Sequence, residues 1–78
     1  MTSFKAGIDG GLVQISHSEH GVAVHKFHGT YEWEAGMVPQ ASCVIKVVDG
    51  CAEIIYEQGS DAEVEEIRTL GFSALEAA

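Results

Sequence analysis

The histidines are the residues of this chain best suited to chemistry, and the four of them fall between His17 and His28. They form two His-x-x-His pairs, and imidazole is a common ligand of zinc and copper. Residues three apart on a strand point to opposite faces, so His25 and His28 cannot share an ion. In the register expected below, His17 and His25 share a face and His20 lies in the adjoining turn. This trio is the candidate site for a divalent metal; the alternative is that His25 is packed in the core and the others are solvated.

No enzymatic motif accompanies these histidines. The sequence has no Gly-x-Ser-x-Gly, no glycine-rich phosphate loop ending in Lys-Ser/Thr and no His-Glu-x-x-His. If the protein were an enzyme, His25 with Tyr31 or a glutamate would be the candidates. We expect a protein that is not an enzyme and needs no cofactor.

Two aromatic residues, Tyr31 and Trp33, occupy alternate positions of an expected strand. Tyrosine and tryptophan are favoured at binding surfaces, so the pair could face a ligand. Alternate aromatic residues on a strand more often fill a core, and we favour that interpretation.

The charge balance is strongly acidic. Twelve Asp and Glu against four Lys and Arg give a net charge of −8. Such a chain repels phosphate backbones and anionic membrane surfaces, so we expect it to bind neither. Acidic residues gather towards the C-terminus, where Asp61, Glu65 and Glu66 form a candidate patch for a basic protein partner. The alternative is a solvated helix face.

The strands are indicated by alternation and by turn residues. Asp49-Gly50 between two β-branched runs predicts a hairpin of strands 42–48 and 51–57 with a two-residue type I′ turn, Lys46 opposite Glu53. Upstream, we expect strands over 3–8, 11–17 and 22–34. A two-residue turn at Asp9-Gly10 would pair Phe4 with Ile15, and a three-residue turn at 19–21 would pair Val13 with Phe27.

The last third of the chain changes to helical spacing. Ser60 and Glu63 form a capping box, which predicts a helix over 61–70, with Gly71 as its stop. A second short helix is expected over 74–77. The sequence thus predicts one α+β domain over 1–78, a five-stranded antiparallel β-meander followed by one C-terminal α-helix. That helix is expected to cover the sheet face that carries Phe4, Ala6, Ile8, Val13, Ile15, Phe27, Tyr31 and Trp33.

The two cysteines indicate the compartment. Cys43 and Cys51 fall on opposite faces of the expected hairpin and several rungs apart, beyond the reach of a disulfide. Free thiols favour a reducing environment, and neither a secretory signal nor a membrane span is visible. We therefore expect a cytoplasmic protein, of a size and acidity shared by many proteins of phages and mobile elements.

Apolar residues on both faces of the 42–57 hairpin indicate self-association. Val44, Val48 and Ile55 lie on the face opposite Ile45, and one short helix cannot cover both sides of a sheet. We expect a homodimer through these three residues. The function expected first is a protein-interaction module or inhibitor that docks through its acidic helix or exposed sheet. A small-ligand or metal-binding protein using His17, His20 and His25 is the alternative.

Overall fold

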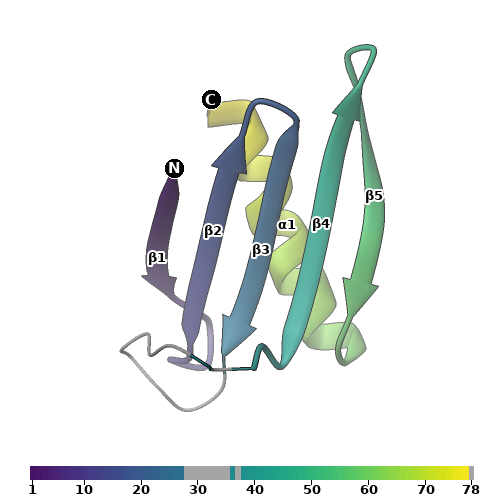
Figure 1. Ribbon diagram of the computed structural model, residues 1–78. Coiled ribbons are helices and arrows are strands. Elements are labelled where there is room, and N and C mark those ends of the chain that lie inside the picture. The colour runs from purple at the N-terminus through teal and green to yellow at the C-terminus, as the bar shows by residue number, and fades with distance from the viewer. Residues whose placement is uncertain (28–35, 37, 78) are drawn as a thin grey trace.

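The computed structural model describes residues 1–27, 36 and 38–77 and has the predicted α+β architecture (Figure 1). One antiparallel sheet contains its five strands in sequence order, and the C-terminal helix α1 crosses one face of it. The elements are β1 Thr2–Ala6, β2 Leu12–Ser18, β3 Gly21–Phe27, β4 Ala41–Val48, β5 Cys51–Gln58 and α1 Asp61–Ala77. Among the described residues, no helix has the length and apolar character needed to cross a membrane.

The β4–β5 hairpin has the predicted turn and starting register. Asp49 and Gly50 have φ angles of 52° and 80°, the positive values that a type I′ turn requires. Lys46 pairs with Glu53, as expected from the length of that turn. Further along, Ile45 pairs with Ile54 but Val44 pairs with Tyr56, so Ile55 is the additional residue of a β-bulge.

The two upstream registers differ from those predicted by one residue. Phe4 pairs with Gln14 instead of Ile15, because the β1–β2 connection spans Gly7 to Gly11 instead of two residues. Val13 pairs with Lys26 instead of Phe27, because Gly21 pairs with Ser18 and leaves a two-residue turn. A one-residue slip moves every side chain of a strand to the other face. Phe27 and Phe4 therefore lie on the face away from α1, and the predicted helix-covered face is wrong for them.

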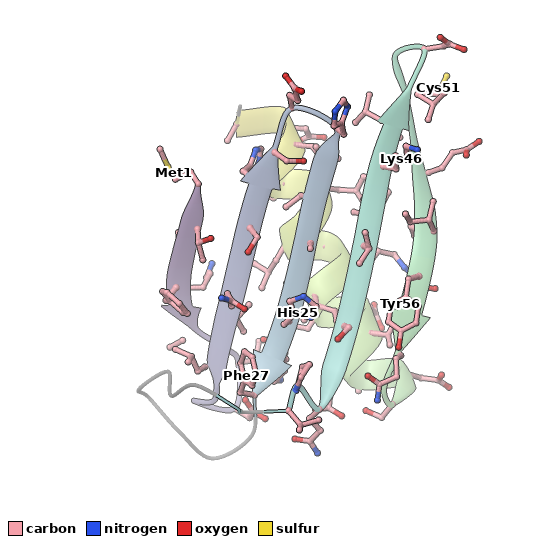
Figure 2. The ribbon with its side chains drawn as sticks, viewed as in Figure 1. Met1, His25, Phe27, Lys46, Cys51 and Tyr56 are labelled. Atoms are coloured by element: carbon pink, nitrogen blue, oxygen red, sulfur yellow. The ribbon has the colours of Figure 1, made fainter. Side chains whose placement is uncertain are left out.

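The core lies between α1 and the central strands. α1 packs across β3 and β4 and touches β2 more lightly. The buried apolar residues of this core are Val13, Val22, Val24, Ala41, Cys43, Ile45 and Ile67. The opposite face of the sheet, towards the viewer in Figure 2, carries Gln14, His25, Lys46 and Tyr56 and is called the open face below.

Helix α1 begins where the capping box predicted and runs past its predicted end. The Glu63 amide donates to Ser60 Oγ (3.4 Å), and that hydroxyl donates to the Glu63 carboxylate (2.8 Å). The helix then continues through Gly71 to Ala77, so the expected stop and the separate helix over 74–77 are both wrong. Gly71 is buried, and a Cβ there would lie 2.8 Å from Ile45 Cδ1. Glycine at this position allows the close approach of the helix to the sheet.

Candidate functional site

The histidines do not assemble the predicted metal site. His17 pairs with Val22 on the helix-covered face, whereas His25 pairs with Gln14 on the open face. His17 Nε2 donates to the Ala74 carbonyl 2.9 Å away, which ties β2 to the last turns of α1. Within residues 1–27 and 38–77, no three side chains of metal-ligating type are gathered around a common point. The expected shared face of His17 and His25 was wrong because it rested on the register that is shifted by one residue.

His25 and His20 have separate surroundings, and His28 lies outside the described residues. His25 is half-buried, and its Nδ1 shares a 2.9 Å hydrogen bond with Ser42 Oγ on the neighbouring strand. Burial lowers the pKa of His25 below its ordinary value. His20 is exposed in the β2–β3 turn, 3.2 Å from a Glu19 carboxylate oxygen. Each ring is thus associated with a different element of the fold.

A buried ion-pair network joins α1 to the first turn of the chain. The ammonium of Lys26 on β3 points to the helix side and pairs with the Glu66 carboxylate. It also lies 3.3 Å from Asp9 Oδ1. The Lys26 and Glu66 side chains are only 4% and 8% exposed, respectively. A buried charge is tolerated only when it is paired in this way, so Lys26 and Glu66 depend on each other. The Asp9 side chain is 46% exposed and adds a second carboxylate at the edge of this pair.

Backbone groups complete the network. The Ile8 amide donates to Glu66 Oε2 at 2.6 Å, and the Gly11 amide donates to Asp9 Oδ1 at 3.0 Å. The Gly11 bond, with help from Lys26, lowers the pKa of Asp9. Burial alone would lower the pKa of Lys26, but its hydrogen bonds to Glu66 and Asp9 outweigh that effect and raise it. Sequence reasoning missed this network; the signal was Lys26 sharing alternate positions with Val22 and Val24.

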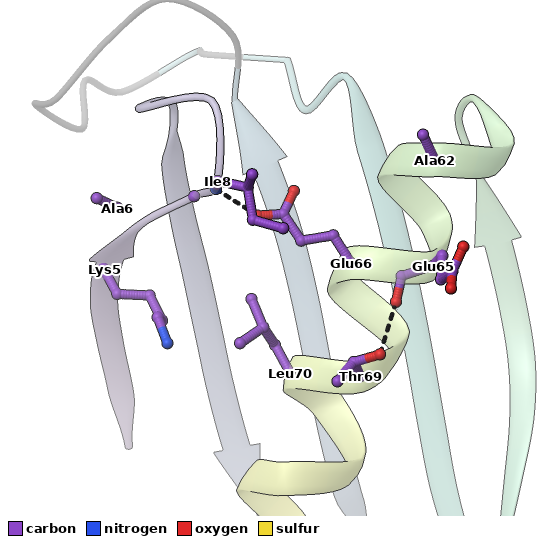
Figure 3. Close-up of a pocket in the computed structure, with 9 residues that line it drawn as sticks. Lys5, Ala6, Ile8, Ala62, Glu65, Glu66, Thr69 and Leu70 are labelled. Carbon is purple, nitrogen blue, oxygen red and sulfur yellow. Dashed lines mark hydrogen bonds between the residues drawn. The ribbon is translucent and has the colours of Figure 1, made fainter.

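A cavity of about 490 Å³ lies between β1 and α1, next to this network (Figure 3). Ala6, Ile8 and Leu70 form apolar walls, and Lys5 and Glu65 stand at opposite sides. Two of its polar side chains are engaged within the protein: Glu66 binds Lys26 and the Ile8 amide, and Thr69 Oγ1 donates to the Glu65 carbonyl at 2.9 Å. The volume would admit a small molecule, but these polar groups serve the fold.

The predicted acidic patch exposes fewer free carboxylates than expected, because some of them form ion pairs within the protein. Asp61 and Glu65 are exposed on α1 as expected, but Glu66 faces inward to Lys26 and is not part of a surface patch. Arg68 lies among them and binds Glu57 through two hydrogen bonds of 2.9 and 2.7 Å. This contact raises the pKa of Arg68. The helix surface is therefore less uniformly anionic than its sequence indicates.

Apolar side chains on the open face gather along β4 and β5. Val44 is half-buried, whereas Val48, Ile55 and Tyr56 are 44%, 57% and 52% exposed. Because Ile55 is the bulged residue, it and Tyr56 both lie beside Val44 instead of alternating across the sheet. They belong to the open face, away from α1, where Figure 2 shows Tyr56. We call these four residues the hairpin patch.

Four further residues were singled out by the sequence: two aromatic residues and the two cysteines. Tyr31 and Trp33 lie outside the described residues. Both cysteines are free, as expected: Cys43 is buried on the helix side and Cys51 is exposed near the hairpin turn.

Comparisons with protein families, with curated proteins and with solved structures found no match to this chain.

Proposed function

We propose that this protein is a non-enzymatic interaction module that docks a protein partner on the open face of its sheet. The observation that carries the proposal is the hairpin patch, where Ile55 and Tyr56 are about half exposed beside Val44. Val48, 44% exposed, lies further along β4, beyond the paired positions of Lys46 and Glu53. Contiguous exposed apolar surface is typical of a binding site, because leaving it in water forgoes burial free energy.

Several contacts favour the sheet over the helix as the docking surface. Glu66 is committed to Lys26, and Glu57 to Arg68, so fewer helix-side carboxylates are available to a basic partner. Exposed charges that remain, such as Asp61 and Glu65, keep their hydration and contribute little to affinity. The acidic helix then serves solubility and leaves the apolar sheet face for recognition.

The cysteines support placing the module in the cytoplasm. Both thiols are free, and the exposed Cys51 would be open to oxidation outside a reducing compartment. Burial raises the pKa of Cys43, which keeps that thiol protonated and unreactive.

Affinity capture from cell extract with three baits tests the proposal: wild type, Ile55→Lys and Glu65→Lys. Each capture is run at about 0.15 M and at about 1 M salt, which shortens the Debye length from about 8 to about 3 Å. A partner held by the sheet face is retained at high salt and by Glu65→Lys, and is lost with Ile55→Lys. Capture that disappears at high salt and with Glu65→Lys, but survives Ile55→Lys, would assign recognition to the acidic helix and contradict the proposal.

A further inference from the structure

The charges of this chain are divided unequally between the two sides of the sheet. Among the described strand residues, the ionised side chains on the open face are Lys46 and Glu53, which lie at opposite positions of β4 and β5. Lys5, Lys26 and Glu57 lie on the helix side, together with the carboxylates of α1. Among the described strands, the charges of the open face therefore cancel, whereas the helix side carries the carboxylates of α1.

The open face also has a groove that could accept the exposed apolar side chains of a second copy of the same face. A shallow groove of about 320 Å³ crosses β2, β3 and β4, and small residues form much of its floor. These are Ser16, Ser18, Gly21 and Ala23, with Val44 and Ile55 along one side. Val44 and Ile55 of the hairpin patch thus border this groove, and the half-exposed side chains of Ile55 and Tyr56 are called the ridge. A surface that carries both a ridge and a groove can be complementary to itself under a two-fold axis.

From these observations we infer that the partner of the open face is a second copy of this chain, seated face to face as a two-fold dimer. The inference rests on the proposed function and names its partner. The ridge of each copy occupies the groove of the other, and Lys46 of each copy approaches Glu53 of its mate. The sheets form the inner layers and both helices lie outside.

Electrostatics favours this arrangement over one that apposes the helices. Packed sheets are about 10 Å apart, and a helix adds a layer of about 10 Å on each side, so the two α1 axes would be about 30 Å apart. That separation is several Debye lengths at physiological salt, so repulsion between the acidic helices is largely screened. A like-charged protein can therefore associate through its neutral face.

Sedimentation and light scattering on the purified chain test the inference. We expect the wild type to have twice the mass of one chain at micromolar concentration. Ile55→Lys should raise the dissociation constant of the dimer by at least about 100-fold, because two-fold symmetry places the substitution in both halves of the interface. Val47→Lys is the matched control, since Val47 lies on the neighbouring strand, is 36% exposed and faces the helix side. It should leave the dimer intact. Tyr56→Ser, a milder change in the same patch, replaces Ile55→Lys if circular dichroism shows that variant to be unfolded.

A charge exchange provides the sharper test. Lys46→Glu places two acids on each open face, and Glu53→Lys places two lysines there, so each variant alone should be monomeric. Mixing the two variants should restore a dimer that contains one chain of each kind. A wild type that stays monomeric, or a dimer that persists in both Ile55→Lys and Tyr56→Ser, would overturn the inference. A monomeric wild type whose captured partner is still lost with Ile55→Lys would leave the proposed interaction function standing.

Discussion

Lys26 and Glu66 are forty positions apart in the sequence and form an ion pair beneath α1, where both side chains are almost wholly buried. The pair joins the centre of the sheet to the first half of the helix. Through Glu66 and the Ile8 amide, and through Asp9, it also holds the β1–β2 connection. One buried network therefore links three separate segments of the chain.

Breaking this pair should cost more than replacing it. Lys26→Met leaves the buried Glu66 without its cation, and we expect the free energy of unfolding to fall by about 3–5 kcal/mol. The double variant Lys26→Met/Glu66→Leu removes both charges and should be more stable than Lys26→Met alone. Urea titrations of the wild type, both single variants and the double variant provide the measurement. A loss below about 1 kcal/mol in Lys26→Met would contradict a structural role for the pair.

Stability should depend on pH through His25. Its pKa is lower in the folded protein than its ordinary value of 6.5, so below that value the unfolded chain binds more protons than the native one. The free energy of unfolding should consequently fall as the pH drops from 6.5 through the folded pKa. His25→Gln keeps a hydrogen-bonding group near Ser42 and cannot titrate. Denaturation curves between about pH 7.5 and 5 should show a smaller decline for this variant. Equal declines would refute the assignment to His25.

Gly71 should be the most size-sensitive position on the helix. Gly71→Leu places a side chain where even a Cβ lies 2.8 Å from Ile45 Cδ1, and Ile45 is only 1% exposed. We expect a loss of at least about 2 kcal/mol from overpacking, despite the better helix propensity of leucine. Ser73→Leu, at an exposed position of the same helix, should change stability by no more than about 0.5 kcal/mol. Thermal denaturation of the two variants compares them directly.

The two thiols should differ sharply in reactivity. Cys51 is exposed, whereas Cys43 is 0% exposed and its thiol pKa is raised by burial. A thiol reagent at neutral pH should therefore modify Cys51 quickly and Cys43 only after denaturant is added. Cys51→Ser should abolish the fast phase. Fast labelling of Cys43 in that variant would show that α1 opens readily from the sheet.

The amino-acid sequence determined the elements and the local signals. Alternation and β-branched runs located the strands, Asp49-Gly50 specified its turn through two positive φ angles, and Ser60 with Glu63 marked the start of α1. The separation of Cys43 and Cys51 on the hairpin likewise followed from the length of its turn. These features depend on residues close in sequence, whose conformational preferences act before any long-range packing.

Tertiary structure decided which face each strand presents. The β2–β3 turn is one residue shorter than expected, which reversed the faces of His25 and Phe27 relative to α1. The β1–β2 register is also shifted by one residue, which reversed the face of Phe4. The expectation that His17 and His25 share a face was wrong for that reason, and the buried role of Lys26 was missed for the same reason. The residues of a glycine-containing turn do not by themselves determine its length, since turns of two, three or more residues can accommodate the same sequence. The packed core selects among them: Val22 and Val24 pack beneath α1, while Lys26, on the same face, is buried with its charge paired to Glu66.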